Sequence, residues 1–171
     1  MASKVRVYGK AQNRTALGIV NAYLVMYPHA KFNDFMKAFP KELNPDSGWP
    51  VNFMRLEECL DDEHKNFWFT SHDEILKLQD GTKIVLCKMW TKQSFDRLVS
   101  HAKQYDIEVA EFEKTMKGEK GGFRLEYLNG YIPPKPQKSK IWLWVAIPAA
   151  IIILGLLAWL LFGNKPKEVI V

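Results

Sequence analysis

The feature that most constrains this chain is an uninterrupted apolar run near its C-terminus. Residues 141–162, IWLWVAIPAAIIILGLLAWLLF, hold no charged side chain over 22 positions. A helix of this length rises ~33 Å at about 1.5 Å per residue, which matches the ~30 Å hydrocarbon core of a bilayer. The Ile, Leu, Val and Phe side chains of the run contribute roughly 4–8 kcal/mol towards insertion. The run therefore predicts one transmembrane helix.

Side chains within and beside the run fit the same prediction. Tryptophan rings favour the headgroup level, and basic residues favour the leaflet surface. The expected membrane-flanking residues are Lys138, Lys140, Trp142, Trp144, Trp159 and Lys165. Small residues that would let a second helix approach closely are Ala146, Ala150, Gly155 and Ala158. This patch favours a homo-oligomer, although alanines that face lipid are an equally ordinary interpretation.

The chain divides into four predicted segments. They are a domain over 1–128, a Pro- and Lys-rich linker over 129–140, the transmembrane helix over 141–162 and a short tail over 163–171. The start, MASKVRVYGK, lacks the apolar stretch of a secretory signal. We therefore expect a single-pass, tail-anchored protein whose N-terminal domain is cytoplasmic. Two cysteines, Cys59 and Cys87, suit a reducing compartment.

The net charge of +5 does not by itself indicate a nucleic-acid-binding domain. Residues 1–128 hold 19 Lys and Arg against 18 Asp and Glu, so the flanks of the apolar run carry most of the excess. Inside the domain the charge is polarised. Only basic residues precede Ala30, whereas nine acids lie from Glu42 to Glu74. A domain with this charge separation is more typical of one that binds another protein than of one that binds nucleic-acid phosphates through a uniformly basic surface.

Apolar periodicity and turn residues predict an α+β domain. We expect strands over 4–8, 66–70, 75–78, 83–90, 107–109 and 123–128, and helices over 13–27, 32–39, 56–64 and 92–105. Asn13 or Thr15, Asn33 and Thr91 are the expected helix N-caps. Asp80-Gly81 is a strong hairpin signal. Helices followed by a hairpin and a last helix predict a winged-helix-like domain, and a general α+β domain fits as well.

Two stretches carry a family resemblance. TALGIVNAYLVMYPHAKFNDFMKAFPKEL followed by FWFTSHDEILKLQDGTKIVLCKMW resembles a small bacterial winged-helix-like module found in restriction-type and mobile-element proteins, over about residues 4–107. The landmarks are Phe39, Pro40, Asp80, Gly81, Thr82, Cys87 and Trp90. These residues belong to the fold, so the resemblance implies architecture and transfers no catalytic residue. The membrane tail departs from the module and argues against a simple DNA-reading role.

A search for catalytic patterns indicates no enzyme. Cys59, His64 and His72 lie among acids, but their spacing matches no zinc site. Arg97 and His101 are one helical turn apart, closer than in RNA-cleaving helical domains, so we interpret them as solvated side chains. No phosphate-binding loop or nucleophile elbow is present in the sequence. We expect no catalytic residue, metal or cofactor.

Basic residues on the predicted helices and hairpin remain candidates for nucleic-acid binding. They are Lys4, Arg6, Lys10, Arg14, Lys37, Lys41, Lys83 and Lys88. Solvated surface lysines and arginines are the alternative. We therefore predict a tail-anchored binding or oligomerisation module that recruits a cytosolic protein or nucleic acid to the lipid bilayer. The second interpretation is a membrane effector of a bacterial defence system, which would oligomerise and permeabilise the bilayer.

Overall fold

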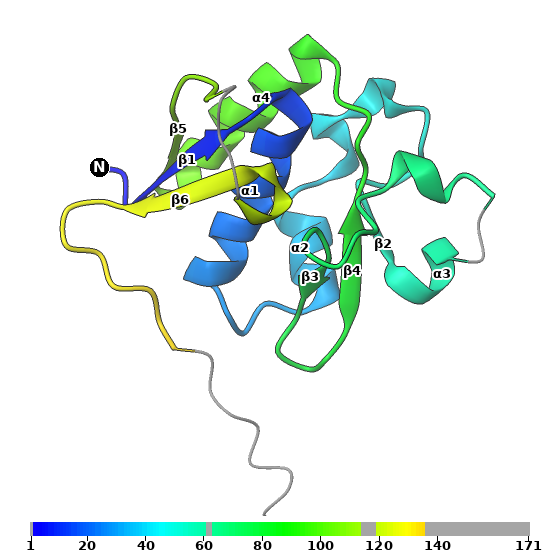
Figure 1. The fold of residues 1–171 in the computed structure, drawn as a ribbon, viewed down its shortest axis with the longest axis horizontal. Coiled ribbons are helices and arrows are strands. Elements are labelled where there is room, and N and C mark those ends of the chain that lie inside the picture. The colour runs from blue at the N-terminus through cyan, green and yellow to red at the C-terminus, as the bar shows by residue number, and fades with distance from the viewer. Residues whose placement is uncertain (1, 61–62, 114–118, 136–171) are drawn as a thin grey trace, which may run out of the picture. The chain divides into compact units, whose positions relative to one another are not determined.

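Two three-stranded sheets and four α-helices make up the described part of the chain, which in this computed structural model comprises residues 2–60, 63–113 and 119–135 (Figure 1). The expected α+β class is confirmed. The residues from 2 to 135 belong to one compact unit. Within the described residues, no helix is both long and apolar enough to cross a membrane.

The first sheet has the order β5-β1-β6 and joins both ends of the domain. Its central strand, β1 (Val5–Gly9), pairs in parallel with β5 (Ile107–Val109) and antiparallel with β6 (Phe123–Tyr127). Val5 and Val7 are fully buried, while Arg6 and Tyr8 alternate with them on the outer face. This period of two is why the segment forms a strand with one core face. The three strands expected here are confirmed.

Helix α1 (Gln12–Met26) covers the inner face of this sheet, and α4 (Lys92–Ala102) packs beside it. Gly18 permits the close approach, since a Cβ there would lie 2.6 Å from Val7 Cγ1. The expected N-cap of α4 is confirmed, because Thr91 Oγ1 accepts a hydrogen bond from the Ser94 amide at 3.1 Å. Such a cap satisfies one of the unpaired amides at the start of a helix.

The second sheet has the antiparallel order β2-β4-β3. Its strands are β2 (Phe53–Arg55), β3 (Leu76–Lys77) and β4 (Lys83–Leu86), so the expected hairpin is confirmed with shorter strands. Gly81 has a φ of +90°, which favours glycine, and the Asp80 carboxylate accepts the Thr82 amide at 2.9 Å. These two residues explain why the chain turns here.

The two remaining helices are α2 (Phe32–Ala38), which precedes β2 in the sequence, and α3 (Leu56–Leu60), which directly follows it. Phe35 of α2 enters the main core, where its ring contacts Tyr23 of α1 edge-on at 5.3 Å. Helix α3 lies next to a separate small cluster of the buried residues Cys59, Trp68, Val85 and Cys87. The domain therefore has one large core and one satellite cluster.

Two of the expected N-caps are wrong. Helix α1 begins after Ala11, which places Asn13 and Thr15 inside it, and the Thr15 hydroxyl donates to the Ala11 carbonyl oxygen at 3.0 Å. Helix α2 begins one residue before Asn33, and the Asp34 carboxylate accepts the Lys31 amide at 2.8 Å. The Asp34 carboxylate, in the first turn of α2, thus satisfies the amide of the N-cap residue, which is a different hydrogen bond from the one expected of Asn33.

The strand expected over 66–70 is also wrong. Residues Lys65–Phe67 form a short 3-10 helix, in which the Phe67 amide donates to the His64 carbonyl at 2.9 Å. Pairing is limited to an isolated antiparallel bridge between Trp68 and Cys87, just beyond β4, and a hydrogen bond from the Phe69 amide to the Leu86 carbonyl at 3.0 Å. The helix expected over 56–64 ends at Leu60, and residues 61–62 lie outside the described part.

The predictions for the C-terminal region fall on residues outside the described part of the chain. They are the second half of the linker, the span over 141–162, the tail over 163–171 and all the named membrane-flanking and small residues between Lys138 and Lys165. They remain predictions.

Candidate functional site

The first basic residues of the chain lie in ion pairs on the outer face of the β5-β1-β6 sheet. Arg6 Nε lies 2.5 Å from Glu108 Oε1 on β5, and Arg6 Nη1 lies 3.5 Å from Glu126 Oε2 on β6. The hydrogen bond from Arg6 lowers the pKa of the Glu108 carboxyl. Lys4 Nζ lies 2.7 Å from Asp106 Oδ2. These cations hold neighbouring strands together and already have anionic partners.

Arg14 on α1 is likewise engaged, in an ion pair with Glu74. Its guanidinium also donates to the Gly121 carbonyl at 3.2 Å and lies 4.9 Å from the ring centre of Phe69. Burial of Glu74, 8% exposed, opposes its ionisation. The hydrogen bonds from Arg14 and the Ser71 amide outweigh this effect, so the pKa of Glu74 is lowered. The pair fixes the loop before β3 against α1.

The other predicted nucleic-acid contacts are divided between engaged and exposed lysines. Lys41 Nζ donates to the Asn44 carbonyl and the Ser47 hydroxyl, each at 2.5 Å, and burial lowers the pKa of Lys41. Lys88 Nζ donates to the Asn66 carbonyl at 3.1 Å. Lys10, Lys37 and Lys83 are exposed and form no ion pair with another described residue. The predicted basic interface would therefore depend mainly on these three.

Arg97 and His101, which were compared with RNA-cleaving domains, connect helix α4 to neighbouring segments. His101 Nε2 on α4 lies 2.6 Å from the carbonyl oxygen of Ala38, the last residue of α2. Arg97 Nη2 lies 3.2 Å from Ser94 Oγ and 3.4 Å from Asp46 Oδ2. Both side chains are half-buried. The expected solvated side chains are thus only partly solvated, because each also contacts a neighbouring segment.

Both cysteines are buried in the satellite cluster. Burial raises the pKa of the Cys87 thiol, which disfavours the reactive thiolate. Within residues 2–60, 63–113 and 119–135, no three His, Cys, Asp or Glu side chains lie close enough to hold a metal ion.

A group of three rings lies in the acid-rich segment, of which two are exposed and one is half-buried. Trp49 lies 5.4 Å from His64 and 6.0 Å from Phe67 between ring centres, and His64 stacks on Phe67 at 6.2 Å. Phe67 is 40% exposed. Helix α3 belongs to the same lobe, since Leu56 and Trp49 pack on the same satellite cluster. We call Trp49, His64 and Phe67, with the exposed carboxylates Glu57, Glu58 and Glu63, the acidic-aromatic surface.

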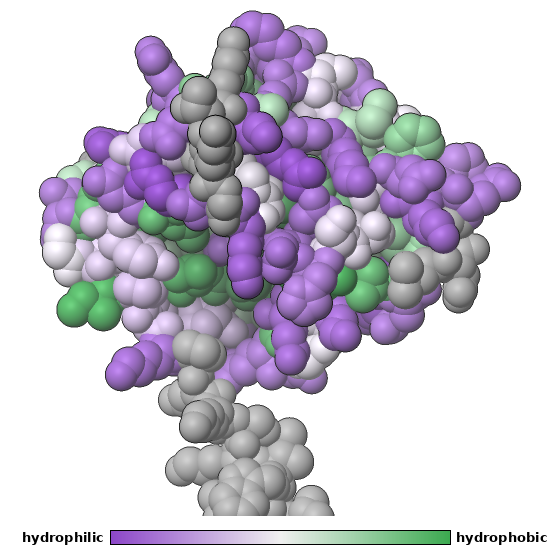
Figure 2. All heavy atoms as spheres, viewed as in Figure 1, coloured by the Kyte–Doolittle hydropathy of each residue, from purple (hydrophilic) through white to green (hydrophobic). Residues whose placement is uncertain are grey.

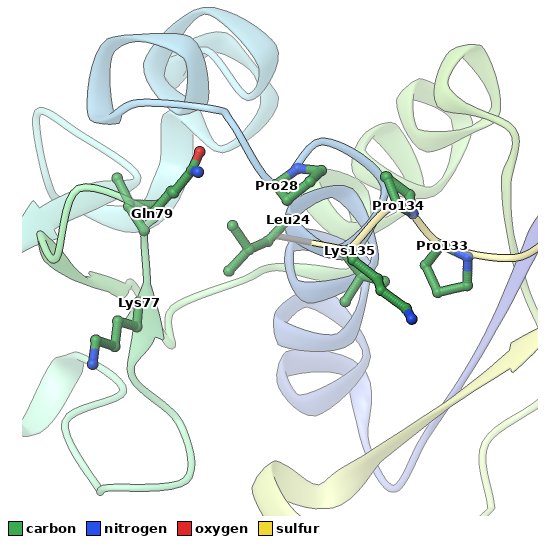
Figure 3. A pocket seen from close by; sticks show the side chains of 9 residues that line it. Leu24, Pro28, Lys77, Gln79, Pro133, Pro134 and Lys135 are labelled. Atoms are coloured by element: carbon green, nitrogen blue, oxygen red, sulfur yellow. The ribbon is translucent and has the colours of Figure 1, made fainter. Parts of the chain in front are cut away.

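A second candidate lies at the end of the domain where the linker leaves. Figure 3 shows a hollow between the C-terminal turn of α1, the β3–β4 hairpin and the linker, and its volume is about 560 Å³. Apolar side chains form most of its wall, including Leu24, Pro28 and Leu78. Pro133 and Pro134 approach from the linker side, while Lys77 and Lys135 extend at the rim (Figure 3).

A second, shallower hollow of about 380 Å³ shares Pro28 and Pro134 with the first. Tyr27 lines it and is 42% exposed. Ile132, at the start of the described linker, is 83% exposed. Figure 2 shows that hydrophilic residues cover most of the visible face, with apolar residues in separate patches between them. The linker end of the domain therefore combines two partly apolar hollows with exposed apolar side chains.

Sequence reasoning missed this end of the domain. The sequence predicts residues 129–140 only as a Pro- and Lys-rich linker, yet Pro134 lines both hollows. The available signal was the apolar pair Tyr131-Ile132 directly before two prolines, in a linker that is otherwise polar. Its contact with residues about one hundred positions earlier has no local signature.

Comparisons with protein-family models, with curated proteins and with solved structures found no match to this chain. The resemblance to winged-helix-like modules consequently remains a prediction from sequence, and the function must be argued from the residues themselves.

Proposed function

We propose that the chain is a single-pass membrane protein whose N-terminal α+β domain binds a basic segment of another protein on the acidic-aromatic surface. The observation that carries the proposal is the ring group of a half-buried Trp49 with the exposed His64 and Phe67 inside the acid-rich segment. The apolar run over 141–162 would hold this domain, and hence its partner, at the bilayer.

The chemistry of the surface suits Lys and Arg side chains. A cation over the face of Trp or Phe gains a cation–π attraction, and nearby carboxylates add charge-assisted hydrogen bonds. Glu57 and Glu63 form no ion pair with a Lys or Arg among the described residues. The Glu63 side chain is 85% exposed, and its carboxylate lies 3.8 Å from His64 Nδ1, beside the ring group.

Nucleic acid is the less supported partner. Phosphate would be repelled by the acidic-aromatic surface, and five of the eight candidate cations already bind carboxylates or backbone carbonyls. If the domain works as a winged-helix-like module, the β3–β4 hairpin would be its wing. In that case Lys77 and Lys83, which face each other across the hairpin, would carry the contact.

The test uses the full chain in nanodiscs and a fluorescent peptide of eight alternating Lys and Arg residues. The triple variant Glu57→Gln, Glu63→Gln, Phe67→Ala should weaken peptide binding about tenfold or more, since a cation–π contact and two charges are lost. Phe112→Ala is the matched control, because Phe112 is 43% exposed but lies outside this surface.

Three outcomes would count against the proposal. One is peptide affinity that does not change in the triple variant. Another is equal loss of affinity in the Phe112 control. The third is tighter binding of duplex DNA than of the peptide by the same nanodiscs, which would favour a nucleic-acid module.

A further inference from the structure

We infer that the linker end of the domain is a docking face for an anionic lipid surface. The face combines the two apolar hollows with the exposed residues Tyr27, Lys31, Lys77, Lys83, Ile132 and Lys135. The inference rests on the proposed membrane span and names which side of the domain meets the bilayer. It concerns a surface other than the acidic-aromatic one.

The length of the chain limits how far this face can stand from a membrane. Six peptide units connect Lys135 to Ile141, where the apolar run begins. Fully extended, they reach at most ~20–22 Å. Headgroups occupy about 5–7 Å on each side of the hydrocarbon core. The elements around Lys135, which are the end of α1 and the β3–β4 hairpin, must therefore remain close to the lipid headgroups.

The charges around Lys135 fit an anionic surface. Lys31, Lys77, Lys83 and Lys135 form no ion pair with a described residue, and Lys77 and Lys83 are opposite each other in the hairpin register. The acids close to them are Asp34 and Asp80, which already accept backbone amides, and Glu57, which lines a hollow with Lys83. The four lysines outnumber these three carboxylates, and such an excess attracts the headgroups of an anionic leaflet.

The apolar residues fit the interfacial layer of a bilayer. Tyrosine prefers the headgroup level, where its ring can be buried while its hydroxyl stays wet. Tyr27 and Tyr127 are 42% and 44% exposed, and Tyr131 lies 6.3 Å from Tyr127 between ring centres. Ile132 offers an aliphatic side chain that protein atoms hardly cover. In water the exposure of these tyrosine and isoleucine side chains is unfavourable. At a membrane surface the same side chains would be buried among the lipid headgroups.

The experiment measures the distance between this face and lipid in the full chain. A fluorophore is attached at Asn33→Cys, which is exposed beside Lys31, or at the control Lys92→Cys, which is exposed on α4. The native cysteines are buried and should label slowly. Nanodiscs that hold one copy of the chain contain headgroup-quencher lipid in either phosphatidylcholine alone or a mixture with phosphatidylglycerol.

We expect the label at position 33 to be quenched at least about twofold more than the label at position 92, and only in the anionic discs. Salt at 0.5 M should reverse the difference, because the Debye length is then only a few ångströms. The triple variant Lys31→Glu, Lys77→Glu, Lys83→Glu should abolish it. The charge-matched control Lys10→Glu, Lys65→Glu, Lys92→Glu, read with the label at position 33, should not.

Equal quenching at positions 33 and 92, or quenching of the same size in neutral and anionic discs, would overturn the inference. Because each disc holds one copy, contact between two copies of the chain cannot imitate the result. A chain that inserts into discs but shows no quenching defeats this inference alone. A chain that fails to insert defeats the proposed function as well.

Discussion

The large core and the satellite lobe of this domain differ in how fully their side chains contact other residues. The large core unites α1, α2, α4 and both sheets, and its aromatic rings contact one another edge-on, as Tyr23 does with Phe35 and Phe39. The satellite lobe, which we define as the Cys59, Trp68, Val85 and Cys87 cluster with the residues packed on it, is built from a short strand, a one-turn helix and 3-10 turns.

Polar groups are paired unevenly across the domain. On the outer face of the β5-β1-β6 sheet, Arg6 forms ion pairs with both Glu108 and Glu126. In the satellite lobe, Trp68 is fully buried and its Nε1 atom has no hydrogen-bond partner among the described residues. Three further buried polar atoms without a partner in the described chain, Asn44 Oδ1, Asn52 Oδ1 and Arg97 Nε, lie outside the satellite lobe, so the contrast depends on the exposed rings and carboxylates that a partner could reach. The comparison therefore assigns stability to the large core and binding to the satellite lobe.

The largest expected effect compares two phenylalanines. Phe35→Ala removes a fully buried ring from the large core and should lower the free energy of unfolding by about 3–5 kcal/mol. Phe67→Ala removes a ring that is 40% exposed and should cost less than ~1 kcal/mol. Urea unfolding of the detergent-solubilised chain, followed by circular dichroism, measures both. Similar costs would remove the distinction between the two regions.

The ion pair of Arg14 and Glu74 should show an intermediate effect. Glu74→Gln removes the carboxylate beside a partly buried guanidinium and should cost about 1–3 kcal/mol at pH 7. Since the pKa of Glu74 is lowered in the folded protein, its contribution is present above the pKa of the unfolded chain and is lost as the pH falls through the folded pKa. The cost should therefore shrink in urea titrations near pH 3.

Arg55→Gln provides the matched control for this pair. Arg55 and Glu58 form an exposed ion pair at 3.2 Å in the satellite lobe, and such pairs contribute little. Suppose that loss of Arg55 destabilised the domain as much as loss of Glu74. The stability of the two regions would then depend equally on their ion pairs, and the distinction between them would not hold.

Sequence patterns predicted the elements whose cause is local. Val5 and Val7 alternate with polar residues, Asp80-Gly81 closes a hairpin and Thr91 caps α4, so each could be predicted from a short window. The bridge between Trp68 and Cys87 could not, because a turn at residues 65–67 interrupts the strand composition. The parallel pairing of β1 with β5 joins residues about one hundred positions apart.

The candidate sites were harder to predict for a related reason. A basic residue in a sequence does not reveal its partner, and Arg6 and Arg14 both pair with carboxylates far along the chain. The acidic segment was correctly located as a feature of the sequence, but the ring group of Trp49, His64 and Phe67 depends on the fold of the lobe. Charge composition can be counted from sequence, whereas the pairing of charges requires the structure.

The smallest expected effect compares two tryptophans and tests the satellite lobe directly. Trp90 Nε1 donates a hydrogen bond to the Cys87 carbonyl at 2.8 Å, so Trp90→Phe removes that bond together with buried area and should cost about 1–3 kcal/mol. Trp68→Phe removes buried area too, but it also removes an indole N–H that has no partner in the described chain. The two effects oppose each other, and the net change should be within ~1 kcal/mol of zero.

The same urea titrations in detergent decide between these values. A near-neutral Trp68→Phe beside a destabilising Trp90→Phe would mean that the satellite lobe keeps a polar group at a net cost to its own packing. Proteins commonly accept such a cost where a surface serves binding more than stability. If Trp68→Phe instead cost as much as Trp90→Phe, the indole would be well satisfied, and the satellite lobe would be an ordinary extension of the core whose exposed rings need another explanation.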